Sequence, residues 1–119
     1  MARVLAVNDD PDLLMMCQIV LESAGHQVET VMEGGAVLDV VKRFEPDFIL
    51  LDWVLEDITG GDVLALLNAS VDGRCPVLVI SALDRVATLS RILGAEGFLR
   101  KPFTAEELIE AVEKLDAVR

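Results

Sequence analysis

Short apolar segments alternate along the chain with segments of helical periodicity, and this alternation constrains the fold more than any other feature. Five apolar or β-branched runs are typical of strands. They occupy residues 4–7, 28–32, 48–51, 76–80 and 97–99. Apolar residues at helical spacing follow each run. A β-α unit repeated five times predicts an α/β fold with one parallel sheet, right-handed crossovers and helices on both faces.

The helical segments begin and end at residues that commonly cap helices. Asp10 followed by Pro11 favours a helix start, and Gly25 favours a helix end. Thr104 and Glu107 match a capping box at the start of the last helix. The residues expected to face the core at helical spacing are Leu13, Cys17, Val20, Leu21, Ala24, Val37, Val40, Val41, Phe44, Val63, Leu66, Leu67, Val86, Leu89, Leu93, Leu108, Ile109, Val112 and Leu115.

The apolar runs differ in a way that predicts their places in the sheet. Residues 48–51 and 76–80 are continuously apolar, as strands covered on both faces are. Residues 28–32 alternate between apolar and polar side chains. The first two runs are therefore expected at the centre of the sheet and the third at an edge.

The length and composition indicate a single soluble domain spanning residues 1–119. Hydrophobic residues make up 53% of the chain and aromatic residues only 4%, so we expect an aliphatic core. No apolar run approaches the roughly 18 residues that a membrane span needs, and the N-terminal residues do not resemble a signal peptide. The expected location is the cytoplasm, with no membrane contact.

The formal net charge of −11 excludes several classes of partner. Nucleic acids and anionic lipids repel so acidic a chain, and no direct binding to nucleic acid is expected. Cys17 and Cys75 lie far apart without a CxxC motif or a histidine cluster, which favours two buried thiols in a reducing compartment. His26 stands alone and is interpreted as a surface or turn residue rather than a ligand.

Polar residues follow four of the five predicted strands near the point where each strand ends. The carboxyl ends of parallel strands meet at one edge of the sheet, where α/β folds bind ligands, so we expect these side chains to converge. Taken singly, each also has a structural explanation, such as a helix cap or a turn. The residues concerned are Asn8, Asp9, Asp10, Asp52, Ser81 and Lys101.

Three of these residues are carboxylates that would repel one another unless a cation lay between them. Oxygen ligands such as Asp9, Asp10 and Asp52 favour a hard divalent cation, Mg²⁺ or Mn²⁺, that retains several waters. A metal beside a carboxylate, an ammonium group from Lys101 and a hydroxyl from Ser81 also meets the requirements of phosphoryl transfer. The cations offset charge on the phosphoryl oxygens, and the carboxylate can act as the nucleophile.

Four stretches of the sequence resemble the receiver domains of two-component response regulators, a family that includes the chemotaxis regulators. The stretches are "NDDPD" after the first predicted strand, "ILLDWVLEDITGG" around the third, "VISA" at the end of the fourth and "GFLRKPF" at the fifth. Their joint order and spacing over the whole chain are highly specific. The resemblance implies a flavodoxin-like, doubly wound (βα)5 fold with strand order 2-1-3-4-5.

The resemblance also implies a phosphoacceptor site. Asp52 would accept a phosphoryl group from a phosphohistidine on a sensor histidine kinase or a histidine phosphotransfer protein. Asp9 and Asp10 would bind Mg²⁺ together with Asp52 and the backbone carbonyl of Val54. Lys101 would pair with the phosphoryl group. The chain would then be a signalling domain and not an enzyme, although it would take part in its own phosphorylation and slow self-dephosphorylation.

A conformational switch is implied in the same way. Ser81 would hydrogen-bond the phosphoryl group, and Phe98 would occupy the aromatic switch position. The face formed by the fourth helix, fifth strand and fifth helix would then change, and a downstream protein or output domain would respond to it. The Lys101–Pro102 bond would be a cis peptide, a geometry rare outside X-Pro bonds.

Two further positions are implied in setting the lifetime of an aspartyl phosphate. Val54 lies two residues after the acceptor, and Leu83 lies two residues after the hydroxyl of Ser81. In the family these positions flank the path of the water that hydrolyses the acyl phosphate. Both side chains are apolar here and cannot orient a water, so the resemblance predicts slow dephosphorylation.

The sequence also departs from the family pattern. Leu55 and Glu56 stand where the family usually has Met-Pro, so the loop after the acceptor strand lacks a proline and gains a charge. The interval from Ser81 to Lys101 is slightly shorter than is common. Val112 stands where transcriptional members often have Arg, which disfavours dimerisation through their charged network.

Three alternative functions compete with the phosphorylated receiver. A pseudo-receiver would use the same fold only as a constitutive interaction domain, and it usually lacks an acidic residue or the lysine that are present here. A phosphatase of the haloacid-dehalogenase type would need a second Asp two residues after the nucleophile, where Val54 stands. A flavin mononucleotide binder would need a phosphate loop after the first strand, where carboxylates would repel the phosphate.

Overall fold

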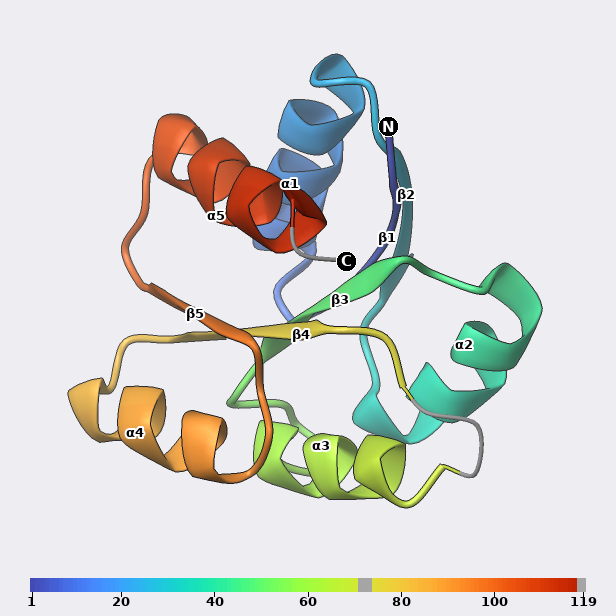
Figure 1. Cartoon of the computed structure of the whole chain (residues 1–119), viewed down its shortest axis with the longest axis vertical. Coiled ribbons are helices and arrows are strands. Elements are labelled where there is room, and N and C mark those ends of the chain that lie inside the picture. The colour runs from blue at the N-terminus through green and yellow to red at the C-terminus, as the bar shows by residue number, and fades with distance from the viewer. Residues whose placement is uncertain (71–73, 118–119) are drawn as a thin grey trace.

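The computed structural model describes residues 1–70 and 74–117 and contains one five-stranded parallel sheet. The strand order β2-β1-β3-β4-β5 confirms the expected doubly wound, flavodoxin-like α/β fold (Figure 1). All four strand pairings are parallel. The strands are β1 (Arg3–Val7), β2 (Gln27–Val31), β3 (Phe48–Asp52), β4 (Val77–Ser81) and β5 (Gly97–Arg100).

The helices cover both faces of this sheet. In Figure 1, α1 and α5 lie together on one face, and α2, α3 and α4 lie on the other. No helix in residues 1–70 or 74–117 is long and apolar enough to cross a membrane. The helices are α1 (Pro11–Ser23), α2 (Val37–Phe44), α3 (Gly60–Asn68), α4 (Asp84–Ile92) and α5 (Ala105–Ala117), and a 3₁₀ turn, η1 (Gly34–Ala36), precedes α2.

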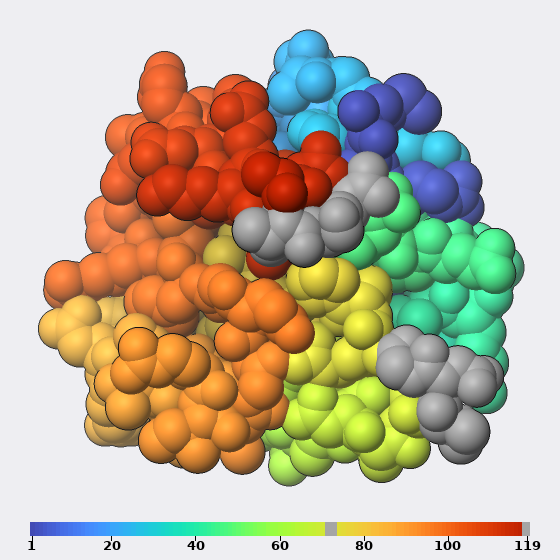
Figure 2. Space-filling view, viewed as in Figure 1, coloured from blue at the N-terminus to red at the C-terminus, as the bar shows by residue number. Residues whose placement is uncertain are grey.

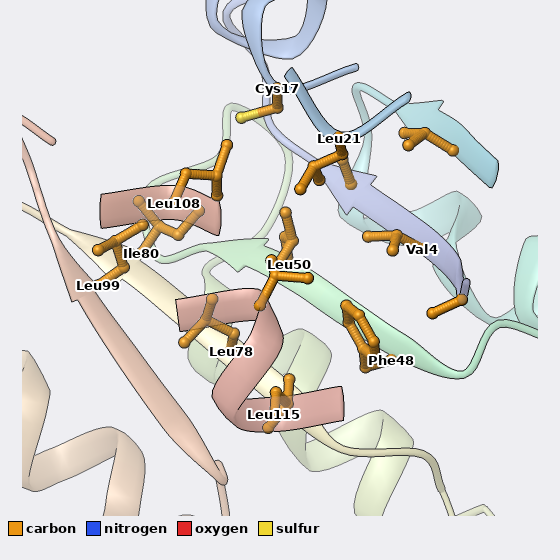
Figure 3. Packing of buried hydrophobic residues seen from close by; sticks show 14 of the residues in the cluster. Val4, Cys17, Leu21, Phe48, Leu50, Leu78, Ile80, Leu99, Leu108 and Leu115 are labelled. Atoms are coloured by element: carbon orange, nitrogen blue, oxygen red, sulfur yellow. The ribbon is translucent and has the colours of Figure 1, made fainter. Parts of the chain in front are cut away.

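Two separate apolar cores hold these layers together. Every residue of β3 and β4 is buried, which confirms that they are central strands, and β2 lies at an edge as expected. Successive side chains of a strand point to opposite faces. Leu50 therefore packs under α1 and α5 with Phe48 and Leu78 (Figure 3), and Leu51 packs under α2, α3 and α4.

The helix caps expected from the sequence are present. The Asp10 carboxylate caps α1, and Pro11 is its first residue. Gly25 and Gly94 follow α1 and α4 with φ values of +95° and +98°, a region that glycine adopts without strain. Thr104 and Glu107 form the capping box of α5 through reciprocal hydrogen bonds of 2.9 and 3.1 Å.

Some residues expected in the core are exposed. Leu66, Leu89 and Leu93 have exposed fractions of 44, 42 and 37%, and Ala24 is exposed as well. Leu64, in the same helix as Leu66, is fully buried. Helical spacing alone is compatible with an apolar stripe on this helix that includes Leu66 and faces the core. In the structure, α3 is rotated so that Leu64 meets the sheet in its place.

The single histidine and the two cysteines are all at least partly buried. His26 follows the turn after α1 and is half-buried, and its Nδ1 accepts a hydrogen bond from the N–H of Ala2 at 3.1 Å. Cys17 is buried as expected, but Cys75 is only partly buried. Burial raises the pKa of each thiol to about 11, so both cysteines are protonated at neutral pH.

Candidate functional site

The sheet itself brings the polar residues at the strand ends together. Asp52 and Ser81 are the last residues of β3 and β4. Hydrogen bonds beyond the strand ends extend the pairing, because the N–H of Lys101 donates to the carbonyl of Ser81 at 2.9 Å and the N–H of Asn8 donates to Val31 at 3.0 Å. The carboxyl edge of the central strands is therefore a polar site, as the sequence predicts.

Asp52 is the centre of this site. Its side chain is only 3% exposed, and Lys101 Nζ lies 2.9 Å from its Oδ2 atom in an ion pair. The second oxygen, Oδ1, accepts a longer hydrogen bond of 3.4 Å from the N–H of Val54. The Lys101 side chain is 29% exposed and reaches the carboxylate from the rim. The site thus presents a buried carboxylate to a partly hydrated ammonium group.

The surroundings of Asp52 shift its pKa upward. Burial is the largest cause, because a carboxylate loses its hydration there. Lys101 opposes the shift through its hydrogen bond and charge, and the charge of Asp9 adds to it. A cation placed beside Asp9 and Asp52 would remove the repulsion that these two carboxylates exert on each other.

We expect Asp52→Asn to raise the thermal unfolding midpoint at neutral pH. The pKa of Asp52 is raised in the folded protein, so at pH values below the ordinary pKa of 3.8 this carboxyl does not lower the free energy of unfolding. As the pH rises through this value, the unfolded chain ionises first and stability falls. A gain of about 1 kcal/mol would raise the midpoint by about 4 °C in a domain of this size. Thermal unfolding of both proteins in metal-free buffer from acid to neutral pH is the measurement, and an advantage that grows toward low pH would contradict the expectation.

The two acidic residues after β1 have different surroundings. Asp9 is half-buried and its charge acts on Asp52. Asp10 is exposed, and its Oδ1 accepts hydrogen bonds from the N–H groups of Asp12 at 3.0 Å and Leu13 at 3.4 Å. The buried Asn8 accepts from the N–H of Asp10 at 2.9 Å. Asn8 therefore fixes the turn that aims Asp10 at the helix.

The described residues contain no cluster of three or more Asp, Glu, His or Cys side chains close enough to hold a metal ion. The sequence led us to expect Asp9, Asp10 and Asp52 to converge, whereas here Asp10 turns to the helix. The remaining donors still fit Mg²⁺, because this ion commonly uses one or two carboxylates and keeps several waters. The cap also occupies Oδ1 of Asp10 only.

The remaining residues expected at the site lie at the ends of β3, β4 and β5 or in the loops that follow them. Ser81 is buried, and its Oγ accepts a hydrogen bond from the N–H of Leu83 at 3.0 Å. Val54 and Leu83 are exposed, with exposed fractions of 61 and 41%. The Lys101–Pro102 peptide is cis, the geometry that the resemblance implies.

Phe98 lies apart from the carboxylates. It is half-buried on β5 and packs against the core beneath α2, α3 and α4. It also lines a hollow of about 190 Å³ between α4 and β5, together with Ala87 and Ser90. The ring therefore has a neighbouring space on the side of α4.

Comparison with known proteins identifies the family. The profile of the response regulator receiver domain matches residues 4–113, nearly the whole described chain. The chain belongs to this family. The match confirms the resemblance found in the sequence and places the chain in a family of signalling domains of two-component response regulators rather than in an enzyme family.

Relatives of this receiver domain include longer regulators. It is 34% identical over 114 residues to the DNA-binding response regulator MtrA of Mycolicibacterium smegmatis, covering 92% of this chain and 48% of that protein. It is 38% identical over 117 residues to the transcriptional regulatory protein PrrA of Mycobacterium leprae, covering 95% of this chain and 49% of that protein. The chain thus spans about half the length of these relatives.

The receiver domain is also similar to solved structures. The chemotaxis protein CheY4 of Vibrio cholerae matches with a TM-score of 0.87 and 29% identity, covering 97% of this chain and 98% of that one. The receiver domain of a LuxO repressor protein from Vibrio parahaemolyticus matches with the same TM-score and 28% identity, covering 96% of this chain and 88% of that one. These similarities agree with the observed fold.

Proposed function

We propose that this receiver domain accepts a phosphoryl group on Asp52 from a phosphohistidine of a sensor histidine kinase or a histidine phosphotransfer protein. The observation that carries the proposal is the buried Asp52 carboxylate with Lys101 Nζ at 2.9 Å from its Oδ2 atom. A carboxylate oxygen attacks phosphorus, the phosphorus–nitrogen bond to the histidine breaks, and imidazole leaves. The product is an aspartyl phosphate.

Mg²⁺ or Mn²⁺ is the cofactor that fits this reaction. Bound at the site, it would neutralise charge on the phosphoryl oxygens. Asp9 and Asp52 would be its carboxylate ligands, with the backbone carbonyl of Val54 and, through its second oxygen, Asp10. Lys101 holds a positive charge beside the acceptor. The buried hydroxyl of Ser81 is the group that would donate to a phosphoryl oxygen.

Modification by a small phosphodonor tests this function. Incubation with acetyl phosphate and Mg²⁺ should add one phosphoryl group to the protein, measured by intact mass. EDTA should prevent the addition, because removing the cation exposes the phosphoryl charge to the carboxylates. Labelling that ignores EDTA would contradict the metal requirement. The absence of any labelling would instead favour a receiver fold used as a constitutive interaction domain.

The output of the domain is proposed to run through α4, β5 and α5. These elements form adjoining parts of one surface (Figure 2), and Phe98 is a half-buried residue of β5. A cavity of about 450 Å³ between β5 and α5 is lined by Phe98, Glu107 and Lys114 among others. A downstream protein or an output domain of a longer chain would read this face in the cytoplasm. The net charge of −11 makes direct contact of this domain with nucleic acid unfavourable.

Beryllofluoride, which imitates a phosphoryl group, is expected to change this output face. Its fluorine atoms should draw the Ser81 hydroxyl inward, away from the N–H of Leu83 that it now accepts from. Phe98 could then rotate, so that a partner would distinguish two states. The measurement is the pattern of NMR shifts with beryllofluoride and Mg²⁺, with Asp52→Asn as the control. Shifts confined to residues around Asp52 would contradict the coupling.

The aspartyl phosphate is expected to be long-lived. Val54 and Leu83 are both exposed and apolar, and neither side chain can orient an attacking water. Replacing Val54 by Asn and Leu83 by Ser should quicken phosphate release. One hydrogen bond that lowers the barrier by about 1.4 kcal/mol gives about a tenfold change. The test is phosphate release from purified phosphoprotein after removal of the donor. Equal rates in the wild type and the double variant would show that these side chains do not set the lifetime.

A further inference from the structure

A single carboxylate ties the loop between β3 and α3 to the turn before α2. Asp57 lies in this loop, and its Oδ1 accepts a hydrogen bond from the N–H of Gly34 at 3.0 Å. Its Oδ2 accepts from the N–H of Gly35 at 2.9 Å. The two N–H groups lower the pKa of Asp57, with the bond from Gly35 as the largest cause, so the carboxylate stays ionised. We call this pair of hydrogen bonds the Asp57 clasp.

The backbone of the turn lies directly against the loop at the Asp57 clasp. A Cβ atom on Gly34 would be 2.7 Å from Ile58 Cγ1 and 2.8 Å from Val63 Cγ2. A Cβ atom on Gly35 would be 3.3 Å from Asp57 Oδ2. Glycine at these two positions therefore lets the N–H groups reach both oxygens of one side chain.

The loop held by the Asp57 clasp carries Val54. The base of the loop is closed by a hydrogen bond of 2.7 Å from the N–H of Gly60 to the carbonyl of Trp53. Leu55 is buried, but Glu56 and Asp57 are exposed. Glu56 stands where the family usually has proline, so this part of the loop lacks the fixed φ that proline supplies. The clasp restrains the same stretch by hydrogen bonds.

We propose that Asp57 is a positioning residue for the metal, because the Asp57 clasp restrains the loop that carries Val54, whose N–H donates to Asp52 Oδ1 at 3.4 Å and whose carbonyl is a proposed metal ligand. This inference rests on the proposed function. A ligand on an unrestrained loop must be ordered when the ion binds, and ordering backbone costs free energy. Losing a group that supports a metal ligand typically lowers metal affinity by about 10- to 100-fold.

The test is a Mg²⁺ titration of Asp57→Ala and Asp57→Asn. Trp53 is the only tryptophan, no tyrosine is present, and Trp53 adjoins Asp52, so its fluorescence reports on the site. We expect the Mg²⁺ dissociation constant to rise about tenfold in Asp57→Ala. The rise should be smaller in Asp57→Asn, because an amide oxygen can still accept one hydrogen bond. In the metal-free variants, the amides of Gly34 and Gly35 should exchange faster with solvent.

Glu33→Gln is the matched control. Glu33 adjoins the same turn and makes no capping hydrogen bond through its side chain, so this change removes one negative charge and leaves the Asp57 clasp intact. If Asp57→Ala, Asp57→Asn and Glu33→Gln all weaken Mg²⁺ binding equally, the lost negative charge alone explains the effect and the inference is wrong. A lower unfolding midpoint with an unchanged dissociation constant in Asp57→Ala would also overturn it. A wild-type protein that does not bind Mg²⁺ would overturn the proposed function together with this inference.

Discussion

Asparagine in place of Asp52 is expected to abolish phosphorylation of this receiver domain. The carboxylate is buried at the end of β3, and Lys101 Nζ lies 2.9 Å from Oδ2. A neutral amide is a much weaker nucleophile, and it attracts the ammonium group and a divalent cation much less than a carboxylate does. The variant therefore loses the attacking atom and its electrostatic support together. After incubation with acetyl phosphate and Mg²⁺, its intact mass should be unchanged while the wild type gains one phosphoryl group.

Asp39→Asn is a suitable control for this experiment. Asp39 is an exposed acid in the first turn of α2, and its replacement changes the net charge by the same amount. It should be labelled as the wild type is. Thermal unfolding should show that Asp52→Asn remains folded. Labelling that persists in Asp52→Asn would mean that another side chain is the acceptor.

Leu50→Ala and Leu51→Ala are expected to destabilise the domain by similar, large amounts. These neighbouring residues of β3 are 1% and 0% exposed, and they belong to the two cores on opposite faces of the sheet. Removing a buried leucine side chain leaves a cavity and typically costs about 3–5 kcal/mol. Each loss is a large share of the roughly 5–15 kcal/mol that stabilises a domain. Urea unfolding monitored by circular dichroism would measure both variants.

Leu66→Ala provides the comparison at an exposed leucine. Its side chain is 44% exposed on α3, so the same truncation should change the free energy of unfolding by about 0.5 kcal/mol or less. A small effect for either Leu50→Ala or Leu51→Ala would contradict a sheet that is packed tightly on both faces. This experiment also tests the orientation of α3, because the sequence pattern alone placed Leu66 in the core.

The sequence by itself determined the architecture of this domain and predicted which residues lie at the carboxyl edge of its sheet. Alternation of strand and helix periodicities requires a parallel sheet covered on both faces, and continuous apolar runs mark its centre. Parallel strands end at one edge, so the residues that follow them must meet there. Asp9, Asp52, Ser81 and Lys101 could therefore be selected without coordinates. A polar residue directly after an apolar run is a local signal in the sequence. In any chain of this topology, the residues that give this signal lie close together at one edge of the sheet.

The tertiary structure decided which atoms of these residues interact. Asp10 was expected with the other carboxylates, but its Oδ1 atom is used by the start of α1. The sequence indicates both a cap and a metal ligand, and the structure shows the cap, which is made by Oδ1 of Asp10. The role of Asn8 was likewise missed, because its contact with the N–H of Asp10 depends on the turn after β1.

Contacts between segments that are distant in the sequence could not be predicted either, because they depend on how the elements pack. The Asp57 clasp joins residues that are 22 and 23 positions apart. Periodicity describes one element at a time, and it does not say how the loops of two elements approach each other or how far α3 rotates on the sheet. The glycine pair before α2 was the available signal, because glycines permit close backbone approach. The packing of α2 and α3 against the sheet decides which carboxylate accepts hydrogen bonds from the two glycine N–H groups. Only the folded chain shows that it is Asp57.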